Sequence, residues 1–245
     1  MWFDALVFVV AAVSASIASV AGFGIGSLLT PTLGLSVGTK LAVAAVSVPH
    51  LVGTAMRFWI LRDAIDLRVL WRFGLASAGG GLAGALVHGW FASPWLSVVF
   101  GVVLLFVAMS EFTGLARRMA FHGSVAWAAG ALSGMLGGLV GNQGGIRSAA
   151  LLGFDLPKRA FVATATATGL MVDAARMPVY AATVGSEMAT IWPIILVATA
   201  GVVLGTVFGG GVLRRIPEPL FRKVVAGLLA VLGIVMLVQG LRPSP

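Results

Sequence analysis

Apolar stretches of membrane-spanning length follow one another along almost the whole chain, separated by short polar or basic segments. Trp2–Val20, Leu41–Ile60 and Leu220–Leu241 are examples. A helix needs about 20 mainly apolar residues to cross the hydrocarbon core of a bilayer. Only 10% of the 245 residues are charged, whereas soluble domains carry about 25%. The sequence therefore predicts an all-α polytopic membrane protein with room for about eight crossings and no sizeable soluble domain.

The net charge of +8 does not indicate a nucleic-acid partner, because the basic residues lie between the apolar stretches. Lysine and arginine gather in the cytoplasmic loops of membrane proteins, and this tendency accounts for them. The chain has no cysteine, and its three histidines lack the spacing of metal ligands. His88 and His122 fall at the ends of stretches and are expected at the membrane interface. The sequence contains no nucleotide-binding loop or catalytic triad, so we expect no metal, no cofactor and no enzymatic activity.

Two glycine-rich motifs interrupt the apolar pattern. The longer one runs from Gly134 to Arg147 and carries Asn142 and Gln143 near its end, and the shorter one runs from residue 22 to residue 26. Backbone at membrane depth can depart from a helix only where protein or a watery cavity satisfies its polar groups. Each motif therefore indicates a broken intramembrane element, and we predict the breaks at residues 24–26 and 143–145.

The two motifs belong to an internal repeat. A displacement of 119 residues (176 − 57 = 119) superposes three pairs without a gap: Gly22 on Gly141, Gly26 on Gly145 and Arg57 on Arg176. This divides the chain into repeats at residues 1–118 and 119–245. Corresponding loops of the two halves differ in basic charge, which places them on opposite sides of the membrane. We therefore predict two inverted repeats, each a glycine-broken re-entrant hairpin plus three transmembrane helices.

A helix that begins at a break presents free N–H groups and a partial positive charge at mid-depth, and glycine lets an anion approach the backbone. The two breaks together predict a shared anion site between the repeats. The predicted substrate-binding residues are Gly24, Gly26, Ser27, Asn142, Gln143, Gly144, Gly145 and Arg147. The alternative is that the glycines only allow close helix crossing, while the two amide side chains bond each other.

Four polar residues inside other apolar stretches are candidates for gating or coupling: His50, Arg57, Asp173 and Arg176. An arginine deep in a membrane costs several kcal/mol unless it is paired or hydrated. Arg57 could avoid that cost by extending to the membrane surface. Asp173 and Arg176 lie one helical turn apart, so their pair could be structural or could be a protonatable gate. His50 could relay protons or be a packed neutral side chain.

The motif residues resemble those of a known family. The relevant runs are Gly22-Phe23-Gly24-Ile25-Gly26 followed by Pro31-Thr32-Leu33, and Gly138-Leu139-Val140-Gly141-Asn142-Gln143-Gly144-Gly145 followed by Leu151-Leu152-Gly153-Phe154. They are similar to those of TauE/SafE-type sulfite exporters, and the resemblance covers nearly the whole chain. It implies a secondary transporter that moves sulfite or a small organosulfur anion across the bacterial cytoplasmic membrane. Ser27 and Arg147 depart from the usual pattern of the family, and Arg147 with the Asn142-Gln143 pair marks a subgroup.

We therefore expect an exporter of a small anion, sulfite or a related sulfonate or sulfur oxyanion, that works by alternating access and could be coupled to protons. The membrane potential alone favours anion exit, by about 2.3 kcal/mol per charge per 100 mV. The alternatives are a passive anion channel, an importer of a different small organic anion, an intramembrane enzyme, and a transporter of a cationic or neutral solute. The sequence is compatible with either a monomer or a homodimer in the lipid bilayer.

Overall fold

The computed structural model describes residues 2–115, 123–142, 144–209, 211 and 217–242, and these ranges contain helices but no strand. The first half consists of α1 (Trp2–Ala21), α2 (Ile25–Val37), α3 (Thr39–Leu61), the 3₁₀ turn η1 (Arg62–Ala64), α4 (Leu67–Val69), the π-helical η2 (Leu70–Gly74), α5 (Leu75–His88) and α6 (Ser93–Thr113). The second half consists of α8 (Gly123–Val140), α9 (Gly144–Leu152), α10 (Lys158–Thr190), α11 (Trp192–Leu204), the π-helical η3 (Gly205–Gly209) and α13 (Glu218–Leu241).

Six helical segments in the described ranges are long and apolar enough to cross a membrane: Trp2–Ala21, Thr39–Ala64, Ser93–Thr113, Gly123–Val140, Trp192–Gly209 and Leu220–Leu241. α2 is apolar but has only 13 residues. α10 has 33 residues and carries Asp173 and Arg176 near its middle. The prediction of an all-α multi-pass membrane fold is confirmed, and the division into inverted repeats stays a prediction.

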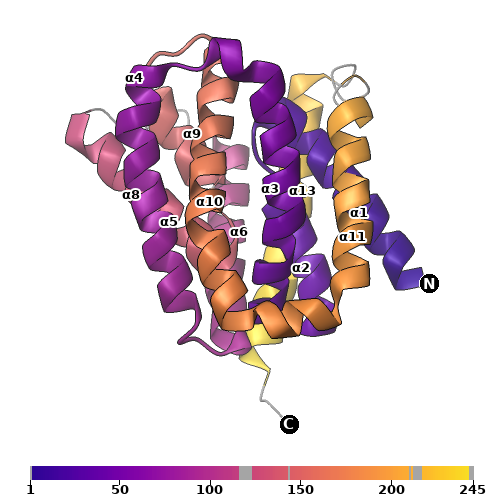
Figure 1. Ribbon diagram of the computed structural model, residues 1–245. Coiled ribbons are helices and arrows are strands. Elements are labelled where there is room, and N and C mark those ends of the chain that lie inside the picture. Colours follow the sequence, from indigo (N-terminus) through magenta and orange to yellow (C-terminus); the bar gives the residue numbers. More distant parts are fainter. Residues whose placement is uncertain (1, 116–122, 143, 210, 212–216, 243–245) are drawn as a thin grey trace.

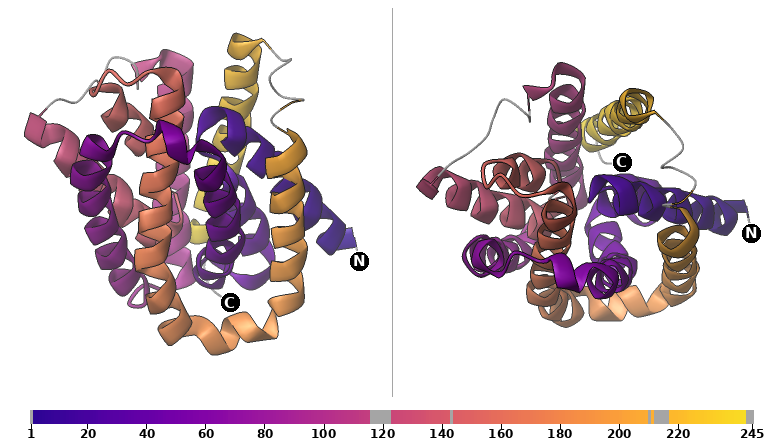
Figure 2. Two further views of the ribbon diagram at one scale, coloured as in Figure 1. Left: turned by 45° about the horizontal axis from the view of Figure 1, so that its top comes forward. Right: turned by 90° about the horizontal axis from the view of Figure 1, so that it is seen from above.

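The long helices α3 and α10 pack directly against each other and carry all four predicted gating residues. They run in opposite directions, upward for α3 and downward for α10 in Figure 1. α5 and α8 pack on one side of α10, while α2 and α11 pack on α3 (Figure 2). The short helices α2 and α9 lead to opposite ends of the molecule, because α3 begins at the bottom and α10 at the top of Figure 1.

α5 and α8 cross with their backbones in contact. A Cβ added at Gly80 or Gly84 would overlap a carbonyl oxygen of α8. One added at Gly134 or Gly138 would overlap a carbonyl oxygen of α5. Small residues permit such close approach, and in a membrane the resulting van der Waals packing replaces the hydrophobic drive that water would supply. This contact fixes α8, which leads into the second break, against a helix of the first half.

α1 is held in a similar way by α11 and η3. A Cβ at Gly201 would lie 2.5 Å from the carbonyl oxygen of Phe8, and one at Gly205 would overlap that of Ala12. Ser16 Oγ also donates to the carbonyl oxygen of Gly205, at 3.3 Å and across 189 residues of sequence. The helix that leads into the first break is therefore held by a helix of the second half.

Candidate functional site

Both helix breaks begin at a glycine with left-handed backbone. α1 ends where Gly22 takes a φ of +80°, and α8 ends where Gly141 takes a φ of +75°. Each glycine still donates its N–H to the carbonyl four residues earlier, to Ala18 at 2.9 Å and to Gly137 at 3.0 Å. Glycine ends a helix in this way because it has no Cβ that would clash in the left-handed region. The two breaks thus begin with the same local geometry, at positions 119 residues apart in the sequence (141 − 22 = 119).

The first break lies at residues 22–24 and the second begins at Gly141, so each begins two residues earlier than predicted. α2 begins at Ile25 and α9 at Gly144. Gly26 and Gly145 are therefore part of the first helical turns. The prediction was wrong in position because Gly22 and Gly141 reverse the backbone, whereas Gly26 and Gly145 remain helical. Gln143, which we predicted as a donor, lies outside the described residues.

The two breaks contact each other. A Cβ added at Gly26 would overlap the carbonyl oxygen of Gly141, and Ser27 Oγ donates to Asn142 Oδ1 at 3.2 Å. In return, Arg147 Nη2 donates to the carbonyl oxygen of Gly22 at 3.1 Å. The turn that follows each break is therefore seated against the other break. This is the proximity that a shared site between the two motifs requires.

Other glycines of the motifs lie against apolar side chains. A Cβ added at Gly24 would meet Ile17. One added at Gly144 would meet Phe23, and one added at Gly145 would meet Val107. For these three, close packing explains the absence of a side chain, as the alternative interpretation expects. Their role as ligands stays a prediction.

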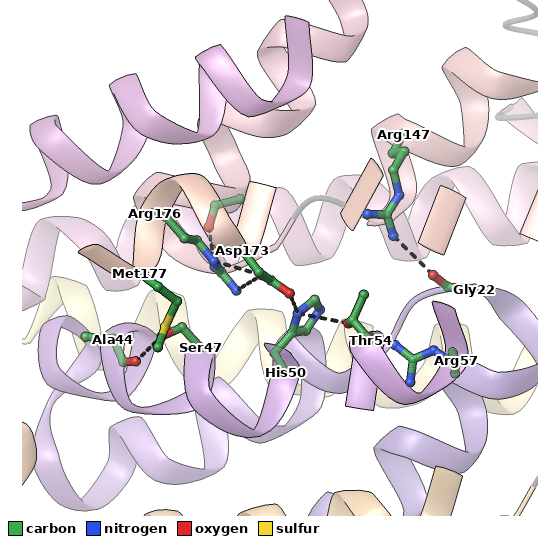
Figure 3. A network of polar contacts seen from close by, with 11 residues as sticks. Gly22, Ala44, Ser47, His50, Thr54, Arg57, Arg147, Asp173, Arg176 and Met177 are labelled. Atoms are coloured by element: carbon green, nitrogen blue, oxygen red, sulfur yellow. Dashed lines mark hydrogen bonds and ion pairs between the residues drawn. The ribbon is translucent and has the colours of Figure 1, made fainter. Parts of the chain in front are cut away.

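Arg57 and Arg147 are buried next to the breaks, with only 6% and 4% of their surfaces exposed. Arg57 donates from Nη2 to Thr54 Oγ1 at 3.2 Å. Within the described ranges, the Nε and Nη1 atoms of both arginines have no hydrogen-bond partner. The two guanidinium groups are close enough for their charges to repel (Figure 3). The alternative that Arg57 extends to the membrane surface is therefore wrong.

Asn142 contributes a further unused donor at the same place. Its side chain is 3% exposed, and while Oδ1 accepts from Ser27, Nδ2 has no partner among the residues that the structure describes. Thr30 Oγ1 is likewise buried without a partner in that part of the chain, and it lies beside Gly141. Unpaired buried donors are costly, by about 1–3 kcal/mol each, so several together indicate a place where a ligand accepts.

Asp173 and Arg176 form the pair expected from their spacing, and His50 joins it. Arg176 donates to Asp173 Oδ1 from Nη2 at 2.7 Å and from Nε at 3.0 Å. His50 Nδ1 lies 2.7 Å from the other carboxylate oxygen, as Figure 3 shows. Asp173 is fully buried and the His50 side chain is 11% exposed, so the imidazole is the more accessible member of the pair. Local sequence pattern does not predict this contact, because 123 residues separate the two.

Three side chains bind successive carbonyl groups in the last turn of α8. Arg176 Nη1 donates to Gly137 at 2.6 Å, the Tyr180 hydroxyl donates to Gly138, and His88 Nδ1 lies 2.8 Å from the carbonyl oxygen of Leu139. The carbonyls of Gly138 and Leu139 come at the end of a helix, where intrahelical donors run out, whereas that of Gly137 also accepts from the Gly141 N–H. His88 is the last residue of α5 and is fully buried, and its place at the membrane interface stays a prediction. The spacing of Tyr180 from Arg176 along α10 did not indicate the carbonyl to which Tyr180 donates. No local pattern shows which helix end a distant side chain will meet.

The buried charges do not balance. In the described ranges the buried charged side chains are Arg57, Arg147, Arg176 and Asp173. Three cations and one anion leave a net charge of +2 when the histidines are neutral (3 − 1 = 2). A buried charge without a counter-charge costs several kcal/mol, so an anion bound here would relieve that cost. Groups of three or more residues able to hold a metal ion do not occur among the described residues.

Fold and site together define a multi-pass helical membrane protein whose interior is cationic at two helix breaks that contact each other. Over residues 6–236 the sequence matches the family model described as "Sulfite exporter TauE/SafE". The chain belongs to this family, which places it among membrane transporters of sulfur anions. Searches of curated proteins and of solved structures gave no match.

Proposed function

We propose that this chain exports a small sulfur oxyanion, sulfite or a related sulfonate, across the bacterial cytoplasmic membrane by alternating access. The observation that carries the proposal is the pair of buried, incompletely bonded arginines, Arg57 and Arg147, beside the two helix breaks. Arginine presents planar, permanently charged donors that suit the oxygens of such an anion. An anion between these groups would accept from the Nε and Nη1 atoms that no protein group satisfies in the described ranges.

Each part of the proposed site has a distinct role. Arg57 and Arg147 supply the positive charge, and Asn142 Nδ2 supplies a neutral donor. The first turns of α2 and α9 add free N–H groups and the positive ends of two helix dipoles. Ser27 positions Asn142 through its hydrogen bond to Oδ1. Binding of the anion would thereby draw groups from both halves of the chain onto one ligand.

The same arrangement supports alternating access. The site lies between elements of the two halves, so a small rotation of one half against the other would open it toward one side or the other. His50 and Asp173 would couple this movement to protons, because the imidazole is the more accessible member of a buried ion-pair network. The membrane potential would favour export of the anion.

Reconstitution of the purified protein into liposomes loaded with sulfite tests the proposal. We expect saturable sulfite efflux and saturable counterflow, which a passive channel would not give. Arg57→Gln and Arg147→Gln should each lower the rate at least about tenfold, the effect of about 1.4 kcal/mol of lost anion stabilisation. Arg68→Gln is the matched control, since it removes the same charge from an exposed position on α4. Equal rates for the two buried variants and for the control would refute the site.

A further inference from the structure

Arg57 and Arg176 occupy equivalent positions in the repeat but have different partners. They lie 119 residues apart, and so do the residues to which each donates, Thr54 and Asp173 (173 − 54 = 119). In each helix the arginine bonds the side chain three residues before it. On α10 that side chain is a carboxylate, whereas on α3 it is a neutral hydroxyl. The charge of Arg176 is therefore cancelled within its own helix, and the charge of Arg57 is not.

The positive charge of Arg147 is likewise not cancelled by a carboxylate of its own. The protein group that accepts from its guanidinium is the carbonyl of Gly22, which is neutral. Asp173 lies near enough to act on Arg147 electrostatically, but its two oxygens are already bonded to Arg176 and His50. Two full positive charges thus remain at the breaks. One singly charged ligand would neutralise only half of them.

We infer that the site selects a doubly charged oxyanion over a singly charged organosulfonate. The inference rests on the proposed function and specifies its substrate class. Two guanidinium groups that repel each other become mutually compatible when a dianion lies between them. Their free Nε and Nη1 donors together with Asn142 Nδ2 make five unused N–H-bearing atoms for one ligand (2 + 2 + 1 = 5). The oxygens of a sulfate-like group can accept from several of these donors at once.

Sulfate and methanesulfonate form a matched pair of probes for this inference. They share a tetrahedral sulfur with oxygens of the same kind, and they differ in one oxygen against one methyl group and in one unit of charge. Binding to the purified protein in detergent would be measured by isothermal titration near pH 8, where both probes are fully ionised and histidine is mostly neutral. We expect sulfate to bind at least about fivefold more tightly, because the second charge interacts with a partly desolvated cation pair. A smaller ratio would overturn the inference.

The variant Thr54→Asp gives α3 the carboxylate that α10 already has. It should cancel the charge of Arg57 and lower sulfate affinity at least about tenfold, while methanesulfonate affinity changes by less than about threefold. Thr54→Asn is the control of similar size without charge, and it should retain the preference for sulfate. If Thr54→Asp fails to fold, Arg57→Gln removes the same unit of charge and should remove the same preference. An equal loss of affinity for both probes would contradict the inference.

These outcomes separate the inference from the proposed function. If methanesulfonate binds as tightly as sulfate, the site still takes sulfur anions and only the selection by charge is refuted. If sulfate, methanesulfonate and sulfite all fail to bind, the proposed anion site itself is refuted.

Discussion

Arg147 donates to the carbonyl oxygen of Gly22 at 3.1 Å, although 125 residues separate them. Gly22 is the residue at which the first helix turns, and Arg147 lies in the first turn after the second break. Each break is therefore completed by the other half of the chain. A site that depends on both breaks can form only when the two halves are packed together, so its geometry changes whenever they move relative to each other.

The buried pair of Asp173 and Arg176 should show strong coupling in a double-mutant cycle. Asp173→Asn leaves Arg176 without its counter-charge and should lower the free energy of unfolding by about 3–5 kcal/mol. The double variant Asp173→Asn/Arg176→Gln removes both charges and should be less destabilised than Asp173→Asn alone. Unfolding in mild detergent, followed by circular dichroism, measures this. Additive losses in the double variant would mean that the two side chains do not depend on each other.

Removal of the Tyr180 hydroxyl tests the binding of the α8 carbonyls. Tyr180→Phe leaves the carbonyl of Gly138 without its side-chain donor and should cost about 1–2 kcal/mol of stability. The ring itself remains, so its edge-on contact with His88 is preserved. Thr183→Val, which removes an exposed hydroxyl one turn later on α10, should have a much smaller effect on thermal unfolding. Equal stability of Tyr180→Phe and wild type would show that this hydrogen bond contributes nothing.

Alanine substitution of two glycines distinguishes two effects on stability, the loss of close backbone contact between helices and the gain in helix propensity. A Cβ at Gly134 would overlap the Ser77 carbonyl of α5, so Gly134→Ala should destabilise the protein by about 1–3 kcal/mol through overpacking. Gly79 also lies on α5, but a Cβ there meets nothing within 4 Å. Gly79→Ala should be neutral or stabilising by up to about 1 kcal/mol, because alanine is the better helix former. The opposite order of melting temperatures would contradict the packing of α5 on α8.

Gly169 lies beneath the guanidinium of Arg147, which gives a way to move that group without removing its charge. A Cβ at Gly169 would lie 2.7 Å from Arg147 Nη1, so Gly169→Ala should displace the side chain and weaken sulfite binding about tenfold, which is 1.4 kcal/mol. Gly185→Ala on the same helix adds a Cβ into open space and should leave binding unchanged. Titration calorimetry with sulfite compares the two. Unchanged binding in Gly169→Ala would place the ligand away from Arg147.

The sequence predicts the local features of this molecule well. The lengths of the apolar stretches predicted the helices, and the glycine motifs predicted two breaks. Helices and breaks both depend on residues that are neighbours in the sequence. The positions of the breaks were displaced by two residues, since a sequence does not show which of several glycines adopts a positive φ. Gly22 and Gly141 do so here, and Gly26 does not.

The partners inside the site were much harder to predict. The spacing of Asp173 and Arg176 within one helix made their pair predictable. The bond between His50 and Asp173 joins two helices, and nothing in either local pattern indicates it. The burial of His88 depends in the same way on where α8 ends in space. Packing between distant segments decides these contacts, whereas hydropathy and spacing report only on segments that are continuous in the chain.

The packing of α1 against α11 and η3 has a consequence for synthesis. The chain is made from its N-terminus, at about 5–20 residues per second, and Ser16 bonds a residue 189 positions later. α1 therefore leaves the ribosome about ten seconds or more before its partner. During that interval the small-residue face of α1 must be covered by lipid or by the insertion machinery. The packing of α1 in the membrane is thus completed only after η3 has been synthesised.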